Sequence, residues 1–273
     1  GTSITSRSQA LLAADLSALG APAEIVLSGN CPPGFELSGG HCELRSMYQM
    51  YDSLQDAGVG GLKTGLPAYR DGFTPQQIDL GRHLFFDPVL SGDGTVSCAS
   101  CHNPALGFSD GRSLSIGVNG KSVNRSAQSL WNVAFGQRFF WDARAATLEE
   151  QMRGPLYDEK EMANNPEQLL RTLNGIPLYR QLFQQAWPQD FQTADAAISL
   201  RQVETAIAAF QASLISLNSR YDQYAHGYAD ALTGPEKEGM NVFRSFVARC
   251  AECHTPPLFT NQQIAVIGTP ELE

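Results

Sequence analysis

Two copies of the pentapeptide Cys-x-x-Cys-His stand in this chain, at residues 98–102 and 250–254. Two thiols one helical turn apart can each bond a vinyl group of one porphyrin, and the imidazole that follows them can then ligate the iron. The pentapeptide is typical of the attachment site of a c-type haem. It predicts two covalently bound haem c groups, each with two tethers and one iron ligand: Cys98, Cys101 and His102 at the first site, and Cys250, Cys253 and His254 at the second.

Other chemistries also use paired cysteines, but they predict different patterns. A thioredoxin-like pair needs no following histidine and usually lies near a strand-helix-strand unit. A zinc ribbon brings its two pairs within about 20 residues of each other. Here Cys98 and Cys250 are much further apart, and a histidine directly follows each pair. Zinc binding and dithiol chemistry are therefore the weaker interpretations.

The remaining cysteines, Cys31 and Cys42, enclose a Pro- and Gly-rich stretch with little means of burying a core of its own. We expect a disulfide between them. Disulfides persist in oxidising compartments, and covalent haem attachment in bacteria takes place in the periplasm, so a periplasmic protein is predicted. The polar Gly1-Thr2-Ser3 start lacks the charged and apolar regions of a signal peptide. We expect the sequence to be already processed or trimmed.

Length and charge exclude some classes of protein. A chain of 273 residues can bury about three quarters of its unfolded surface, enough for one or two domains. Lys and Arg number 19 against 28 Asp and Glu, a net charge of −9, which argues against binding of nucleic acid. The acidic surface is solvated, or it meets a basic electron donor. No apolar run approaches the length of a membrane helix, so no membrane span is expected.

The elements that must position the two pentapeptides are mainly helical, and strand signals are almost absent. Helix starts are marked by an N-cap residue with a following Pro, or by a capping box, at Thr74-Pro75, Thr147-Leu148-Glu149-Glu150, Asn165-Pro166 and Thr233-Gly234-Pro235-Glu236. Gly175 can end the third of these helices. The last of them leads the chain to Cys250.

The clearest helix is expected from about residue 193 to residue 217. Apolar residues recur there at spacings of three and four, which places them on one helix face: Leu200, Val203, Ile207, Phe210, Leu214 and Leu217. We expect this face to pack between lobes or against a haem edge, with a surface for a partner as the alternative.

Further stretches carry a more specific pattern: Leu80-Gly81-Arg82-His83-Leu84-Phe85-Phe86-Asp87-Pro88, Phe139-Phe140-Trp141-Asp142-Ala143-Arg144, Leu148-Glu149-Glu150-Gln151, Tyr221-Asp222-Gln223-Tyr224 and Pro257-Leu258-Phe259-Thr260. Together with the two pentapeptides they resemble the bacterial di-haem cytochrome c peroxidases and their MauG relatives, from about Leu80 to Pro270. The resemblance implies a mainly α fold of two cytochrome-c-like haem lobes packed together, with few strands.

The same resemblance implies a division of the chain into three parts. Residues 1–70 would be an N-terminal extension with the disulfide loop, and residues 71–230 the first, peroxidatic haem lobe. Residues 231–273 would begin the second, electron-transfer haem lobe. We expect that lobe to be incomplete, because the family continues much further and draws the second haem's other axial ligand from there.

The resemblance also assigns roles to individual residues. His102 would ligate the iron at which peroxide reacts, and His254 the iron of an electron-storing haem. Trp141 matches the tryptophan that conducts electrons between the haems; its alternative role is that of a packed core aromatic. Glu161 matches the distal acid that moves a proton in the peroxide pocket, the alternative being a solvated glutamate in a charged run.

Gln151 and Pro155 match pocket positions on the MauG side of the family. Their alternatives are a helix surface and a helix-ending turn. The family's calcium-binding Asn, expected after Arg125, is Ser126 here. Calcium is therefore an open expectation, with Asn124 as a substitute ligand.

Ordinary members of the family cap the resting peroxide haem with a loop histidine. This chain has no histidine between His102 and Trp141, and Val118 lies in that stretch. An open first iron is thus expected, as in MauG-type enzymes. The remaining histidines have no ligand-spaced companions: His83 and His226 are expected at the surface, and His41 lies within the disulfide loop.

Three functions remain as hypotheses. The favoured one is a periplasmic, MauG-like, peroxide-dependent oxidoreductase that activates hydrogen peroxide at an open first haem and oxidises a side chain of a partner protein. The second is an ordinary di-haem cytochrome c peroxidase that reduces hydrogen peroxide to water with electrons from a small cytochrome or cupredoxin. The third is a non-catalytic di-haem electron carrier, which the open first haem and Glu161 oppose.

Overall fold

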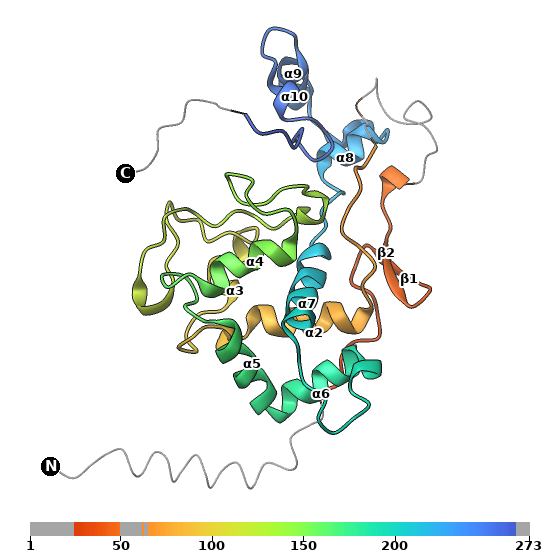
Figure 1. Cartoon of the computed structure of the whole chain (residues 1–273). Helices are drawn as coiled ribbons and strands as arrows, with labels where there is room; N and C mark the ends of the chain where they lie inside the picture. Colours follow the sequence, from red (N-terminus) through yellow and green to blue (C-terminus); the bar gives the residue numbers. More distant parts are fainter. Residues whose placement is uncertain (1–24, 50–61, 63–64, 266–273) are drawn as a thin grey trace, which may run out of the picture.

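Helices dominate the computed structural model of the chain, which describes residues 25–49, 62 and 65–265 (Figure 1). The helices are α2 (Pro75–Phe86), α3 (Cys98–Cys101), α4 (Leu148–Tyr157), α5 (Pro166–Gly175), α6 (Pro177–Ala186), α7 (Leu200–Ala212), α8 (Arg220–Ala225), α9 (Gly234–Arg244) and α10 (Cys250–Cys253). The sheet found in these ranges has two strands. The predicted mainly α fold with few strands is confirmed. None of the helices so described has the length and apolar character needed to cross a membrane.

Helices α2 and α7 cross at the centre of the main body, with α4 and α6 beside them (Figure 1). A Cβ atom placed on Gly81 would lie 1.8 Å from the carbonyl oxygen of Ala206, so the two helices meet backbone to backbone. Leu80 and Leu84 of α2 are completely buried and belong to the same apolar cluster as Val203 of α7. The core therefore depends on glycine at this crossing.

The four helix starts that the capping patterns predict lie where the sequence places them. Thr74, Asn165 and Thr233 are the N-caps of α2, α5 and α9. Thr147 caps α4 by accepting from the backbone N–H of Glu150 at 3.0 Å. The Glu150 carboxylate accepts from the N–H of Ala146 rather than of Thr147, so this capping box is displaced by one residue.

The helix predicted from about residue 193 to 217 is too long at both ends. Helix α7 spans Leu200–Ala212, because neighbouring side chains bind the backbone on either side of it. Before it, the Asn174 amide accepts from the N–H of Ile198 at 2.8 Å. After it, the Asn132 side chain pairs with both backbone groups of Ser216, at 2.8 and 2.9 Å. The apolar residues of the predicted face at 203, 207, 210, 214 and 217 are nevertheless buried.

The disulfide predicted between Cys31 and Cys42 is present. It encloses a hairpin that was not predicted, formed by β1 (Phe35–Ser38) and β2 (His41–Leu44). Both residues of the connecting turn are glycines with positive φ, 55° and 85°, as a tight hairpin turn requires. Cys42 is buried, and its N–H donates to the carbonyl of Phe73 at 2.8 Å. The loop thus packs on the main core.

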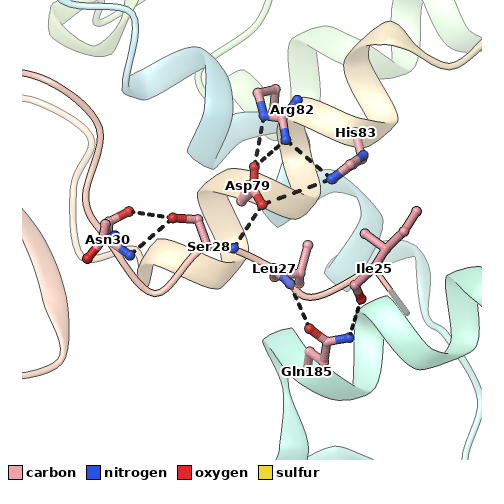
Figure 2. Close-up of polar contacts among 8 residues, drawn as sticks. All are labelled: Ile25, Leu27, Ser28, Asn30, Asp79, Arg82, His83 and Gln185. Carbon is pink, nitrogen blue, oxygen red and sulfur yellow. Dashed lines mark hydrogen bonds and ion pairs between the residues drawn. The ribbon is translucent and has the colours of Figure 1, made fainter. Parts of the chain in front are cut away.

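The segment before the disulfide is also held against the main body (Figure 2). The Gln185 amide of α6 accepts from the N–H of Leu27 at 2.8 Å and donates to the carbonyl of Ile25 at 2.9 Å. The Asp79 carboxylate of α2 accepts from the N–H of Ser28 at 2.9 Å. Arg82 donates to the same carboxylate at 2.8 Å. This segment therefore joins α2 to α6.

The prediction that His226 lies at the surface is wrong. The residue is buried, and its ring meets the Tyr48 ring edge-on at 4.5 Å. Its Nδ1 donates to the carbonyl of Asp222 at 2.7 Å, and the Tyr48 hydroxyl donates to the Asp222 carboxylate at 2.6 Å. His226 is thus held at the C-cap of α8 by its own bond to the helix backbone and by the Tyr48 ring.

The second pentapeptide lies on a small unit, α9 and α10, which projects beyond α8 (Figure 1). Arg220 and Glu236 join α8 to α9 by two hydrogen bonds, at 2.6 and 2.5 Å. Gln262 contacts the main body twice: its side chain donates to the carbonyl of Phe135 at 2.7 Å and accepts from the N–H of Gln137 at 3.1 Å.

Candidate functional site

The first pentapeptide forms the single helical turn α3, with its two cysteines at the ends. Both thiols are free. Burial raises the pKa of Cys98 to about 12. Burial, followed by the nearby charges of Asp110 and Glu161, raises the pKa of Cys101. Burial thus favours the uncharged form of both thiols.

The imidazole of His102 is arranged as a metal ligand. Its backbone N–H donates to the carbonyl of Cys98 at 2.9 Å, which closes the turn. Its Nδ1 lies 2.9 Å from the carbonyl oxygen of Phe108. Because a carbonyl can only accept, Nδ1 carries the hydrogen, and in the neutral ring the lone pair then lies on Nε2. Burial lowers the pKa of His102, and the neutral imidazole is the ligating form.

The second pentapeptide repeats this geometry. The backbone N–H of His254 donates to the carbonyl of Cys250 at 2.9 Å, and its Nδ1 donates to the carbonyl of Phe259 at 3.2 Å. The thiols of Cys250 and Cys253 are free and exposed. Both histidines therefore present Nε2 from the end of a one-turn helix.

Aromatic residues repeat around the two histidines as well. Phe85 lies 6.4 Å from the ring of His102 with a tilt of 44°, and Phe243 lies 6.3 Å from that of His254 with a tilt of 45°. The carbonyl-bearing residues Phe108 and Phe259 both adopt positive φ, 58° and 55°. Such a conformation is uncommon for a bulky side chain. Its occurrence at both sites indicates that the same backbone geometry aims each carbonyl at its histidine.

The residues present fit a haem better than zinc. Within the ranges that the structure describes, no group of three His, Cys, Asp or Glu side chains is placed so that it could hold a bare metal ion. Large apolar side chains are instead uncovered just before the second pentapeptide: Phe246 is 87% and Val247 94% exposed. An apolar macrocycle tethered at Cys250 and Cys253 could pack against Phe246 and Val247.

Glu161 is placed beside the first pentapeptide by close backbone packing. Its carbonyl accepts from the N–H of Val118 at 2.9 Å, and a Cβ on Gly117 would lie 2.0 Å from the carbonyl oxygen of Lys160. The carbonyl of Ile116, next in the chain, accepts from the Cys101 thiol at 3.8 Å. The two segments thus bring Glu161 to the Cys101 side of the site.

The Glu161 carboxyl group is half-buried, and its pKa is raised. Burial is the main cause and the charge of Asp158 adds to it, while Arg144 acts in the opposite direction. Arg144 was not singled out from the sequence. It lies over the ring of Phe140 at 3.4 Å and donates to both oxygens of Asp142, at 2.7 and 2.8 Å. The sequence signal for Arg144 is its position in the Phe-Trp-Asp-x-Arg stretch.

Gln151 and Pro155 lie on α4, one turn apart, and both are half-buried. Pro155 does not end the helix, which continues to Tyr157. Because proline has no N–H, it leaves the carbonyl of Gln151 without the usual helical donor. The carbonyl of Pro155 accepts from Met162 at 3.1 Å. Pro155 therefore contacts the turn that carries Glu161.

Trp141 is 63% exposed, which contradicts the alternative of a packed core aromatic. The neighbouring Phe140 packs inwards instead: a Cβ on Gly154 of α4 would lie 2.7 Å from its ring. Trp141 stands four residues after Gln137, the residue that Gln262 of the second unit contacts. Its role between the haems stays a prediction.

Val118 is buried, with an aliphatic side chain that cannot ligate iron. The candidate calcium ligands Asn124 and Ser126 are both exposed. Calcium binding stays a prediction.

Comparison with known proteins agrees with this geometry. Residues 75–230 match the family described as di-haem cytochrome c peroxidase. The methylamine utilization protein MauG of Methylorubrum extorquens is 37% identical over 195 residues, which are 71% of this chain and 54% of that protein. Cytochrome c551 peroxidase of Nitrosomonas europaea is 36% identical over 187 residues, 67% of this chain and 54% of that protein.

Two solved structures share the fold. The crystal structure of a MauG-like protein associated with microbial copper homeostasis matches with a TM-score of 0.64 and 31% identity, over 75% of this chain and 61% of that one. The di-haem peroxidase BthA of Burkholderia thailandensis matches with a TM-score of 0.60 and 30% identity, over 69% of this chain and 53% of that one. The chain spans about half the length of the curated relatives it matches. With the two repeated histidine sites in place, it belongs to the di-haem cytochrome c peroxidase family.

Proposed function

We propose that the chain binds two haem c groups covalently and acts as a MauG-like, peroxide-dependent oxidoreductase on a side chain of a partner protein. Cys98, Cys101 and His102 would hold the first haem, and Cys250, Cys253 and His254 the second. Periplasmic location belongs to the same proposal and is supported by the disulfide between Cys31 and Cys42.

When bound, the haems supply one-electron redox chemistry and an iron to which peroxide can bind. The protein's own contribution is the movement of a proton. Glu161, ionised, takes a proton from one peroxide oxygen and returns it to the oxygen that leaves as water. Its half-buried position beside Asp158 favours holding that proton between the two transfers.

The observation that carries the MauG-like assignment is the buried Val118 in the stretch where ordinary members have a histidine. No histidine lies between His102 and Trp141 to cap the first iron. We expect the resting ferric protein to give a high-spin electron paramagnetic resonance signal beside a low-spin one. Two low-spin signals would contradict the proposal.

An ordinary cytochrome c peroxidase is the second candidate, because the relatives include peroxidases of that name at similar identity. Stopped-flow mixing with peroxide separates the two. The MauG-like protein should consume peroxide in the fully oxidised state. An ordinary peroxidase should stay inert until one electron has entered. That result would favour the second candidate over the first.

A further inference from the structure

Trp131 connects the surface of the molecule to the first histidine ligand. Its indole is 43% exposed. The inner part of the ring meets Phe108 edge-on, with ring centroids 5.3 Å apart and an interplanar angle of 86°. Phe108 is buried, and its carbonyl accepts from Nδ1 of His102 at 2.9 Å. Two contacts therefore lead from solvent to the imidazole.

The backbone around Trp131 is held firmly. Its own N–H donates to the Ser129 hydroxyl at 3.3 Å, and that hydroxyl donates to the carbonyl of Gly107 at 2.6 Å. The next residue, Asn132, donates from its N–H to the carbonyl of Leu214 at 2.8 Å. The backbone that carries the indole is thus held in place beside Phe108, and the ring itself packs edge-on against it.

The second site has the same arrangement but a different outer residue. Tyr221 meets Phe259 edge-on at 4.9 Å, and the carbonyl of Phe259 accepts from Nδ1 of His254. The Tyr221 hydroxyl donates to the carbonyl of Leu62 at 2.8 Å, and burial raises the pKa of Tyr221 to about 12. The first site instead presents an indole with an exposed edge, so the two outer positions differ in access to a partner.

We propose that Trp131 is a redox-active surface residue through which an electron-rich aromatic side chain of a partner protein delivers electrons to the first site. The proposal rests on the proposed function, since it needs a haem at His102. Phe108 is the packed bridge and is not itself oxidised, because a benzene ring gives up an electron far less readily than an indole. Trp131 is a positioned relay that touches the partner's side chain.

The electrons and protons balance with hydrogen peroxide as oxidant and a phenol as reductant. Trp131 gives up one electron and its Nε1 proton, leaving a neutral indolyl radical. The phenol O–H of a tyrosine returns one electron and one proton, which restores the indole and leaves a phenoxyl radical. Two such cycles convert one hydrogen peroxide into two waters, and the two phenoxyl radicals couple through a new carbon–carbon bond to dityrosine.

The test uses the haem-loaded protein and N-acetyltyrosinamide as the probe. Trp131→Phe keeps an aromatic ring against Phe108 but cannot be oxidised at that position, and should lower the rate of dityrosine formation by about tenfold or more. Trp131→Tyr restores an oxidisable ring and should recover most of the rate. Trp187→Phe is the matched control, because Trp187 is buried and stacked on Phe183 away from both sites. It should leave the rate unchanged.

A second readout is independent of turnover. After a peroxide pulse without probe, peptide mass mapping should find oxygen adducts on Trp131, and a variant with Cys98→Ser and Cys101→Ser should lose them. Adducts that follow exposure alone would favour Trp141 and persist in that variant, which would overturn the proposal. Equal dityrosine rates for Trp131→Phe and the parent at equal haem content would also overturn it while leaving the proposed function intact. A haem-loaded protein that consumes no peroxide would overturn both.

Discussion

Glu161 is the residue on which peroxide activation should depend most. Glu161→Gln keeps the size of the side chain but removes its ability to take a proton, so we expect peroxide consumption to fall by about 100- to 10,000-fold. Haem content should be unchanged. Glu159→Gln is the matched control, because Glu159 lies in the same charged run and is exposed. Similar peroxide kinetics for the two variants would remove Glu161 from the mechanism.

The pH dependence of peroxide consumption tests the environment of the same residue. The ionised form accepts the proton, so the rate should fall as the pH drops through the pKa of Glu161. Burial and Asp158 raise that pKa, which places the fall above the ordinary glutamate value of about 4.3. Arg144→Gln removes the opposing charge and should move the fall to higher pH. A profile that is the same in Glu161→Gln would contradict this assignment.

Sequence and structure differ in how much they reveal about single residues. The cysteine and histidine positions could be predicted because a haem tether is a local pattern of five residues. The effect of Arg144 on Glu161 could not, since it arises where a turn and the segment after α4 meet in space. The burial of His226 depends likewise on Tyr48, far away in the chain.

Among the elements, the crossing of α2 and α7 should tolerate the least change. Gly81→Ala would place a methyl group 1.8 Å from the carbonyl oxygen of Ala206 and 2.9 Å from Cβ of Phe210. Overpacking of this kind costs about 1–3 kcal/mol or more, beyond what alanine gains in helix propensity. Urea unfolding should show the loss of stability.

Gly239→Ala in α9 is the matched control for Gly81. A Cβ at Gly239 would meet nothing within 4 Å, so this substitution should stabilise its helix by up to about 1 kcal/mol. If Gly81→Ala proves as stable as Gly239→Ala, the two helices are not in backbone contact.

Helix starts with a capping pattern could be predicted, as could the end of α5 at Gly175, whereas the end of α7 could not. An N-cap and its partner are three residues apart, so Thr74 and Gln77 show the start of α2 in the sequence. Helix α7 stops at Ala212 because Asn132, distant in the sequence, binds the backbone that follows. The apolar spacing of α7 continues past Ala212, because Leu214 and Leu217 stay buried beyond the end of the helix.

At the scale of the whole molecule, the two histidine sites are copies of one arrangement placed in different surroundings. The first is enclosed by the main body, while the second stands on a unit whose helix α9 has no buried residue. This unit meets the rest of the described chain through the Arg220–Glu236 pair, the Tyr221–Phe259 ring contact, Leu258 and Gln262. The contacts of Gln262 have no sequence signal, since glutamine at position 262 matches no motif.

Gln262 should contribute to holding this junction closed. Its side chain makes hydrogen bonds to backbone groups of Phe135 and Gln137, each worth about 1 kcal/mol net. Gln262→Ala should therefore raise deuterium uptake at residues 135–137 and 255–265, while leaving α2 and α7 protected. Gln263→Ala is the control, because the adjacent side chain is exposed and makes neither bond. If both variants exchange alike, the second unit is held instead by the Arg220–Glu236 pair and by the packing of Leu258.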